Sequence, residues 1–319
     1  MASKTKRKSA RLVVLLGGCL GVGVAMVLGG CTQLGLLTLN TAAGLERYSR
    51  TTDLAYGPTA ANRFDLYIPA HPAHSPVVVY FFGGGWNSGD KAWYKFVGAA
   101  LADAGIIAVL PNYSLYPAAR FPVFMHDAAQ AVAWSRAHAA EWGGDPERLY
   151  VAGHSAGAQI AVMLALNEEY LKRVGGSSHW LRGAIGLAGP YDFLPFNEAY
   201  LNDLFGPPAN FPASQPINYV RADAPPLLLM CGLRDRRVNP KNTQNLTSAL
   251  QTAGGQVTTR YFDTAGHADL VVAFSNLRSR RLPVVADIRR FVGVTTPMVA
   301  SAAPAPDAPA DQAPERMEE

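Results

Sequence analysis

The sequence predicts an α/β protein with a predominantly parallel central sheet and helices on both of its faces. Short apolar, β-rich runs alternate with helical patterns along most of the chain, as expected for a sheet wrapped by helices. Two of these runs, residues 76–82 and 106–110, are apolar throughout, which is typical of strands covered on both faces. A third run, residues 149–152, leads into Gly-His-Ser-Ala-Gly and then an alanine-rich helical pattern, which predicts a sharp strand-to-helix turn.

The globular domain is expected to span residues 51–294 and to contain these elements in order. In its first half, strands are predicted at 62–68, 76–82 and 106–110, and helices at 91–104 and 123–140. In its second half, strands are predicted at 149–152, 184–188, 226–231 and 256–262. One helix should follow Ser155, another should cover 242–253, and a last one should begin at Pro283, since proline is tolerated in a first helical turn.

Three segments depart from this alternation. Residues 31–50 are interpreted as a linker. Residues 193–222 scatter Phe, Tyr and Pro among short fragments, and we interpret them as a small lid insertion above the sheet. Residues 295–319 are rich in Ala and Pro and then acidic, a composition typical of a disordered tail.

Residues 1–30 are interpreted as a lipoprotein-type signal segment. Five cations in the first eleven residues precede an apolar, glycine-rich run, and the segment contains no acid. It ends in Leu-Gly-Gly before Cys31, which resembles a bacterial lipoprotein signal and makes Cys31 the predicted lipidation site. Cys19, in a similar setting, and an uncleaved transmembrane anchor are the alternatives. In each case we expect an extracytoplasmic, membrane-anchored protein that faces the periplasm or the cell surface.

The basic balance of the chain belongs to this leader. Its five cations exceed the whole formal charge of +4, so we expect no nucleic-acid partner. Cys231 lies in an apolar strand and is expected to be a buried thiol. The seven histidines show no ligand spacing, and no metal site or cofactor is predicted.

Ser155 is the candidate nucleophile. The glycines beside it let two backbone segments pass closely, and such a turn exposes the serine hydroxyl at the C-terminal edge of a sheet. The five-residue pattern also fits an ordinary tight turn, so the assignment needs a base, an acid and an oxyanion hole.

His267 and Asp235 are the candidate base and acid. Each lies on a loop directly after a predicted strand, and therefore at the same edge of the sheet as Ser155. An imidazole accepts a hydroxyl proton well near neutral pH, and a carboxylate can orient its ring. Asp263 and Asp192 are the alternatives for the acid.

A run of three glycines, residues 83–85, follows the strand at 76–82 and is the candidate oxyanion loop. Glycines allow several N–H groups to converge on one point, where the N–H of Ala156 would join them. A glycine-rich loop before a helix can instead hold a phosphate. However, the run lacks the Gly-Lys-Ser/Thr ending of a nucleotide loop.

Taken together, these residues resemble the α/β-hydrolase superfamily, in particular its hormone-sensitive-lipase-like and feruloyl-esterase-like esterases. The resemblance covers residues 56–292 and includes the glycine run, Tyr-Ser-Leu-Tyr-Pro at 113–117, the serine motif and Gly-His at 266–267. It implies a triad of Ser155, Asp235 and His267 in the chain order of these hydrolases. It also implies oxyanion donors at Gly84, Gly85 and Ala156.

The chain departs from this family at Phe82, where many members carry a histidine that helps to fix the oxyanion loop. A phenyl ring cannot make the corresponding hydrogen bond, so the sequence does not predict how the loop is held or which substrate is preferred. Trp86 and the aromatic residues of 193–222 either line the substrate pocket or only pack in the core and lid.

The resemblance implies a serine carboxylesterase that acts on small-molecule esters through an acyl-enzyme intermediate, without a cofactor. The small lid insertion favours short- to medium-chain acyl groups. Two alternatives stay open: an amidase, formamidase or small-peptide hydrolase of the same fold, and a non-catalytic, tethered binding module.

Overall fold

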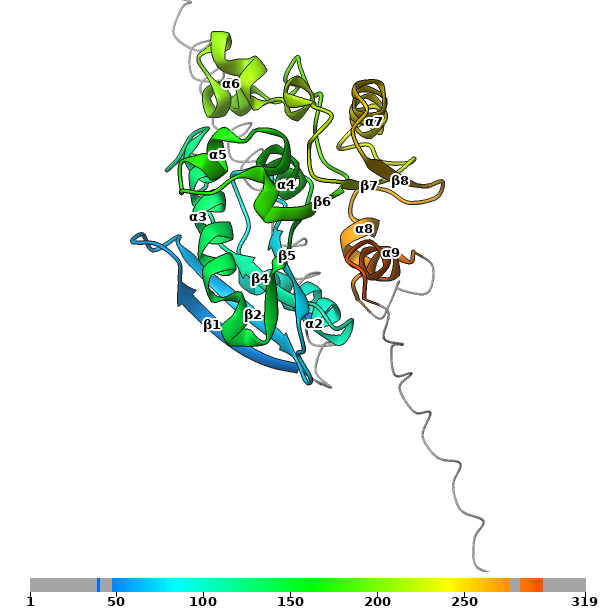
Figure 1. Ribbon diagram of the computed structural model, residues 1–319. Helices are drawn as coiled ribbons and strands as arrows, with labels where there is room; N and C mark the ends of the chain where they lie inside the picture. Colours follow the sequence, from blue (N-terminus) through cyan, green and yellow to red (C-terminus); the bar gives the residue numbers. More distant parts are fainter. Residues whose placement is uncertain (1–38, 41–47, 276–281, 295–319) are drawn as a thin grey trace, which may run out of the picture.

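The computed structural model describes residues 39–40, 48–275 and 282–294, and within them eight strands form one sheet (Figure 1). The strand order is β1-β2-β4-β3-β5-β6-β7-β8. Strands β3 to β8 pair in parallel, whereas β2 is antiparallel to both of its neighbours, β1 and β4. The predominantly parallel sheet predicted from the sequence is confirmed.

The strands are β1 (Tyr48–Ala55), β2 (Arg63–Pro69), β3 (Ser75–Phe81), β4 (Ile107–Pro111), β5 (Gly144–His154), β6 (Leu181–Leu187), β7 (Leu227–Gly232) and β8 (Val257–Phe262). The labelled α-helices are α2 (Lys95–Asp103), α3 (Val123–His138), α4 (Ala156–Leu166), α5 (Glu169–Lys172), α6 (Ala199–Phe205), α7 (Lys241–Ala253), α8 (Asp269–Val272) and α9 (Val284–Phe291). The predicted helix over 91–104 is a 3₁₀ turn, η1 (Lys91–Tyr94), that continues into α2.

Helices cover both faces of the sheet, and the strand register shows which helix lies where. Phe64 and Tyr67 are three positions apart on β2, so their side chains point to opposite faces. The ring of Phe64 contacts Trp134 of α3, whereas Tyr67 lies against Gly98 of α2. Tyr150 of β5 is in register with Tyr67, through the pairing of β2 with β4, β4 with β3 and β3 with β5, so it points to the same face. Its ring contacts Phe291 of α9. Helices α2 and α9 therefore share one face, and α3 lies on the other.

The core is centred on β3 and on α4. Every residue of both elements is buried, which explains why their sequences are apolar with almost no periodic polar face. Cys231 in β7 is a buried free thiol, as predicted. The nucleophile motif thus leads from β5, which pairs with β3, directly into the fully buried α4.

The first strand was not predicted from the sequence. Strand β1 includes Tyr48 to Arg50, which the sequence predicts to be linker, and most of its residues are exposed. Charged contacts hold it instead: Arg50 pairs with Asp65 of β2 at 2.8 Å, and Lys91 bonds both Asp65 and Asp53 at 2.6 Å. An edge strand of this kind lacks the apolar alternation by which strands are recognised.

Residues 193–222 contain α6 and two 3₁₀ turns, η4 (Pro208–Ser214) and η5 (Pro216–Tyr219). Figure 1 shows α6 beyond the ends of the sheet strands, above α3 and α4. The aromatic rings of this segment pack on one another, with Phe193, Phe196 and Phe205 in mutual contact. The segment forms a compact layer over the edge of the sheet.

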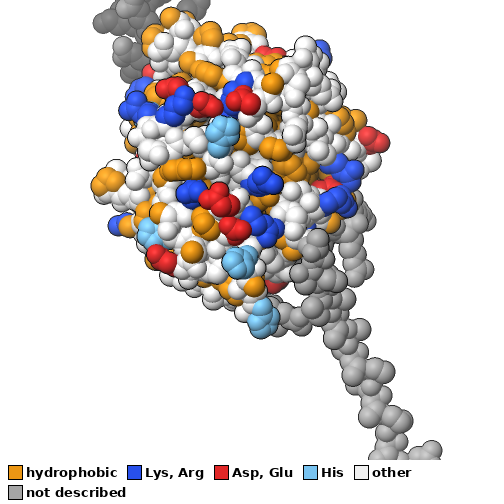
Figure 2. Space-filling model, in the orientation of Figure 1, with side chains coloured by type: hydrophobic (Ala, Val, Ile, Leu, Met, Phe, Trp, Pro, Cys, Tyr) orange, Lys and Arg blue, Asp and Glu red, His pale blue; other side chains and the backbone are white. Residues whose placement is uncertain are grey.

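The surface shows no single-sign charge field on the face in Figure 2, where acidic and basic side chains are interspersed with apolar ones. No helix in the described part of the chain is long and apolar enough to cross a bilayer. The predicted leader, which includes Cys19, the predicted lipidation site Cys31 and the predicted tail all lie outside the described residues.

Candidate active site

Ser155 occupies a strained turn between β5 and α4, at the C-terminal edge of the sheet. Its backbone angles are φ 55° and ψ −121°, a conformation that non-glycine residues rarely adopt. The neighbouring glycines are required here, because a Cβ on Gly153 would lie 2.2 Å from the carbonyl oxygen of Gly157. A Cβ on Gly157 would lie 2.0 Å from the carbonyl oxygen of Phe81. The turn predicted from the motif is therefore present.

Asp235 and His267 meet at the same edge of the sheet. Asp235 lies on the loop of residues 233–238 after β7, here called the acid loop, and His267 on residues 263–268 after β8, the base loop. Nδ1 of His267 donates to Oδ2 of Asp235 over 2.8 Å. The other carboxylate oxygen accepts the N–H groups of Arg237 and Val238 at 2.8 and 2.9 Å.

The pKa of Asp235 is set by two opposed effects. Burial raises it, but the hydrogen bond and charge of His267 and the two backbone N–H groups outweigh burial, so the pKa lies below its usual range. The carboxylate is therefore ionised near neutral pH, as a group that orients an imidazole must be.

Neither of the two alternative acids bonds His267. Asp192 accepts a hydrogen bond from Asn245 at 2.6 Å, and Asp263 is exposed to solvent. The acid and base loops are instead joined directly, since the N–H of Arg234 donates to the carbonyl oxygen of Ala265 at 3.0 Å. Of the three aspartates considered, Asp235 is the one that bonds His267.

Ser155 and His267 share this edge but, among the described residues, no hydrogen bond joins the serine hydroxyl to the imidazole. Such bonds are often long until substrate binds. The nucleophile turn and the base loop are joined through the residue before the serine: Nε2 of His154 lies 2.9 Å from the carbonyl oxygen of His267.

The glycine loop, residues 83–85, follows β3 and uses conformations that suit glycine. Gly84 has φ 134° and Gly85 has φ 60°. The carbonyl oxygen of Gly84 accepts both the N–H and the hydroxyl of Ser88, at 3.1 and 2.9 Å. The turn is so tight that a Cβ on Gly84 would lie 2.0 Å from the carbonyl oxygen of Ser88.

Phe82 holds the glycine loop by packing rather than by a side-chain hydrogen bond. Its ring stacks between Tyr113 and Tyr94, at centroid distances of 4.5 and 5.7 Å. The hydroxyl of Tyr113 donates to the carbonyl oxygen of Phe82 at 2.8 Å, and that of Tyr94 to the carbonyl oxygen of Gly83 at 3.4 Å. Two tyrosine hydroxyls thus bond the carbonyl oxygens at the start of the loop, those of Phe82 and Gly83.

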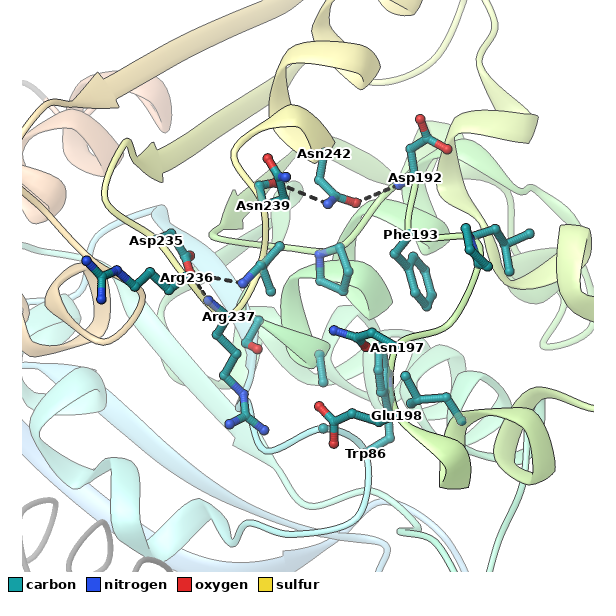
Figure 3. A pocket seen from close by; sticks show the side chains of 18 of the residues that line it. Trp86, Asp192, Phe193, Asn197, Glu198, Asp235, Arg236, Arg237, Asn239 and Asn242 are labelled. Atoms are coloured by element: carbon teal, nitrogen blue, oxygen red, sulfur yellow. Dashed lines mark hydrogen bonds between the residues drawn. The ribbon is translucent and has the colours of Figure 1, made fainter.

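A cavity of about 630 Å³ opens at this edge, and Figure 3 looks into it. Ser155, Ala156 and Gly85 line it together, whereas Gly84 and His267 are not among its lining residues. In Figure 3, Asp192 and Phe193 lie on one side, and Asp235, Arg236 and Arg237 on the other. The remaining lining residues are Trp86, Pro190, Leu194, Pro195, Asn197, Glu198, Tyr200, Leu201, Arg236, Arg237, Val238, Asn239, Pro240 and Asn242.

Residues 193–222 build one wall of the cavity and also contact the glycine loop. Trp86 lines the cavity and stacks on Phe193 at 5.8 Å, so it both lines the pocket and packs against this segment. The hydroxyl of Tyr200 donates to the carbonyl oxygen of Gly85 at 3.1 Å. Burial, reinforced by the charge of Glu198, raises the pKa of Tyr200 to about 12 and keeps it a neutral donor.

Sequence reasoning did not identify four of these contributors, His154, Tyr94, Tyr113 and Tyr200. All four act on backbone carbonyls of residues 11 to 115 positions away in the chain, and no local pattern marks such contacts. His154 had a visible signal, since it lies inside the serine motif beside the nucleophile. Among the described residues, no group of three or more His, Cys, Asp and Glu side chains is placed to hold a metal ion.

Comparison with known proteins agrees with this geometry. The family model of BD-FAE matches residues 64–250. The chain belongs to this family. It is 30% identical over 284 residues to esterase LipQ of Mycobacterium tuberculosis, covering 82% of this chain and 66% of that protein. It is 28% identical over 240 residues to isoprenylcysteine α-carbonyl methylesterase ICME of Arabidopsis thaliana, covering 68% of this chain and 56% of that protein. The chain thus spans between half and two thirds of the length of these curated relatives.

Solved structures show the same fold. A hyperthermophilic esterase from the archaeon Pyrobaculum calidifontis superposes with a TM-score of 0.69 at 20% identity, covering 84% of this chain and 92% of that one. The native esterase Est2 of Thermogutta terrifontis gives 0.61 at 25% identity, covering 76% of this chain and 91% of that one. The predicted α/β-hydrolase fold is confirmed, as is the resemblance to its hormone-sensitive-lipase-like and feruloyl-esterase-like esterases.

Proposed function

We propose that this protein is a serine carboxylesterase in which Ser155 is the nucleophile, His267 the general base and Asp235 the residue that orients the base. The observation that carries the proposal is the placement of a strained, cavity-lining serine on the sheet edge where a carboxylate bonds an imidazole. Such a combination is the arrangement that acyl transfer needs.

In the proposed reaction, Ser155 attacks the ester carbonyl while His267 takes the hydroxyl proton. The N–H groups of Gly84, Gly85 and Ala156 stabilise the oxyanion, and the first turn of α4 favours negative charge there. His267 then protonates the leaving alcohol, and water activated by the same ring releases the acid. The ionised Asp235 keeps Nδ1 protonated, so that Nε2 is free to accept the proton.

The substrate is proposed to be a small ester with a short- to medium-chain acyl group. A cavity of about 630 Å³ holds a small molecule, and Trp86, Phe193 and Leu201 give it apolar surface. Its wall on the side of Phe193 and Leu201 is formed by seven residues of one short segment, 193–201, which fits a limited acyl length.

Ester hydrolysis is preferred to amide hydrolysis because the curated relatives carry the names of an esterase and of a methylesterase. Phe82 does not argue for a decayed, non-catalytic module, because the loop beside it is held by two tyrosine hydroxyls instead. An amidase and a binding module are therefore alternative outcomes of the test below.

The test is a panel of p-nitrophenyl esters graded by acyl length, with aryl esters, sugar esters and the matching anilides. We expect turnover of short and medium esters, and a loss of kcat/KM of about a million-fold in Ser155→Ala. A fluorophosphonate probe should label the wild type and not this variant. Faster cleavage of the anilides would favour an amidase, and an unlabelled, inactive wild type would favour a binding module.

We also propose that Cys31 carries a lipid that anchors the enzyme outside the cytoplasm. The basic, acid-free segment that precedes Leu-Gly-Gly-Cys supports this assignment. Labelling of the full chain with a radioactive fatty acid tests it, with Cys31→Ala and Cys19→Ala as a matched pair. Loss of label in the Cys19 variant alone would move the site to Cys19, and no label in the wild type would contradict lipidation.

A further inference from the structure

His154 is a buried, titratable side chain at the site that the proposed mechanism does not use. It is the last residue of β5, directly before Ser155, and is only 6% exposed. Its ring lies beside the ring of His267, with a centroid distance of 4.7 Å. His154 therefore lies between the nucleophile and the base.

The hydrogen bond of His154 fixes its protonation. A carbonyl oxygen only accepts, so Nε2, 2.9 Å from the carbonyl oxygen of His267, carries the proton. Burial, and next the charge of His267, lower the pKa of His154 to about 3; the other charged groups that act on it are Asp235 and Arg237. The ring is therefore neutral, and remains a donor, throughout the range in which the base works.

The contact also has a geometric consequence. His267 is held at its side chain by Asp235, which fixes the tilt of the ring but not the path of the base loop. At the main chain, the carbonyl oxygen of the same residue is bonded by His154. Since His154 and Ser155 are consecutive, this side-chain bond connects the backbone of the base to the residue directly before the nucleophile.

We propose that His154 is a positioning residue: its Nε2–H, bonded to the carbonyl oxygen of His267, sets the reach of the base toward Ser155. This inference rests on the proposed esterase function. A displacement of about 1 Å between reacting groups costs up to about 100-fold in rate, so the loss of this bond should act on turnover rather than on substrate binding.

The test compares two substitutions at this position. His154→Phe keeps a ring against His267 but has no donor, whereas His154→Gln restores an N–H donor at a similar reach. We expect kcat on a short p-nitrophenyl ester to fall about 10- to 100-fold in the Phe variant, with KM nearly unchanged. The Gln variant should recover most of this loss.

A spectroscopic measurement separates positioning from general stability. The Nδ1 proton of His267, bonded to Asp235, should give a far-downfield proton resonance in the wild type and in His154→Gln. We expect this resonance to be broadened or lost in His154→Phe while the unfolding temperature shows that the chain is folded. If the Phe variant does not fold, His154→Asn, whose donor is too short to reach, takes its place.

Two results would overturn the inference. One is a Phe variant with wild-type kcat or an unchanged resonance. The other is an equal loss in both variants, since packing and not the donor would then matter. Failure of the proposed function is distinguishable, because the wild type itself would then hydrolyse no ester and bind no fluorophosphonate.

Discussion

The two sides of the site hold their functional groups by different interactions. The glycine loop is held by neutral contacts: the stack of Phe82 between two tyrosines, and tyrosine hydroxyls that donate to its carbonyl oxygens. The acid and base loops are held by titratable groups, with Asp235 and His154 both bonded to His267. One side therefore depends on packing and the other on protonation.

This difference predicts which substitutions should affect turnover and which should affect stability. Neutral hydroxyl-to-carbonyl bonds each contribute about 1 kcal/mol and do not change with pH, whereas a charged partner contributes more and is lost on protonation. Substitutions on the acid–base side should therefore affect turnover most strongly and with pH. On the glycine-loop side, removal of a tyrosine hydroxyl should cost only modest stability, whereas a change that moves the loop itself should lower turnover.

Among the substitutions that leave Ser155 in place, the largest effect is expected from Asp235→Asn. The amide oxygen can still accept the N–H groups of Arg237 and Val238, so the acid loop should keep its shape, but the anion that faces His267 is gone. By analogy with the same change in serine proteases, we expect kcat to fall about 10⁴-fold. Steady-state kinetics measures it, with exposed Asp263→Asn as the control that should retain activity. Comparable loss in that control would contradict the assignment of Asp235.

The next largest effect is expected from Gly84→Ala. The substitution places a Cβ at φ 134° and 2.0 Å from a backbone oxygen of Ser88, so the glycine loop must move. Because the loop is proposed to hold the oxyanion, kcat should fall about 100- to 1,000-fold. Gly254→Ala is the matched control, since Gly254 also has a positive φ, 81°, but open space around it after α7. If Gly84→Ala kept wild-type kcat, the N–H groups of the glycine loop would not be needed to stabilise the oxyanion.

Local patterns were enough to predict the framework of this molecule. The strands β2 to β8 are marked by apolar runs, by alternation or by β-rich composition in their own sequences, and the turn at Ser155 by the glycines that its tight geometry requires. Asp235 and His267 could be placed at one edge because both follow parallel strands. Their bond to each other follows from this placement, while their roles in catalysis stay a prediction.

What the sequence could not predict depends on contacts between distant residues or on charge. Strand β1 is held by Arg50 and Lys91 and lacks an apolar pattern. The support of the glycine loop by Tyr113 joins residues 31 positions apart, and the bond from His154 to His267 joins residues 113 apart. Only the folded sheet brings such partners together, which is why the role of Phe82 stayed open.

A third prediction concerns acid stability and uses the buried His154. Its pKa is about 3 in the folded chain against about 6.5 in the unfolded chain, so between these values the unfolded chain binds more protons. Acidification from pH 7 to pH 5 should therefore cost the wild type about 2 kcal/mol through this residue, and His154→Gln should escape that part of the loss. Urea unfolding at the two pH values measures it. Exposed His71→Gln should follow the wild type, and a Gln variant that also follows it would contradict the buried, neutral state of His154.

The smallest effect is expected on the glycine-loop side, from Tyr113→Phe compared with Tyr94→Phe. Both changes keep the ring that stacks on Phe82, and each removes one hydroxyl from a loop carbonyl. The bond of Tyr113 is short, 2.8 Å, so its loss should lower the free energy of unfolding by about 1 kcal/mol. The bond of Tyr94 is 3.4 Å long, and its loss should have a smaller effect.

The two tyrosine variants should also differ from His154 in how their effect depends on pH. Burial raises the pKa of Tyr94 to about 12 and that of Tyr113 well above its usual value, so both hydroxyls stay neutral donors from pH 5 to pH 8. The losses in the two tyrosine variants should therefore be equal at both pH values, unlike the loss through His154. Urea unfolding of wild type and variants at pH 5 and 8 decides the point. A pH-dependent loss, or a larger one in Tyr94→Phe, would mean that titratable groups hold the glycine loop as well, and the two sides of the site would no longer differ in kind.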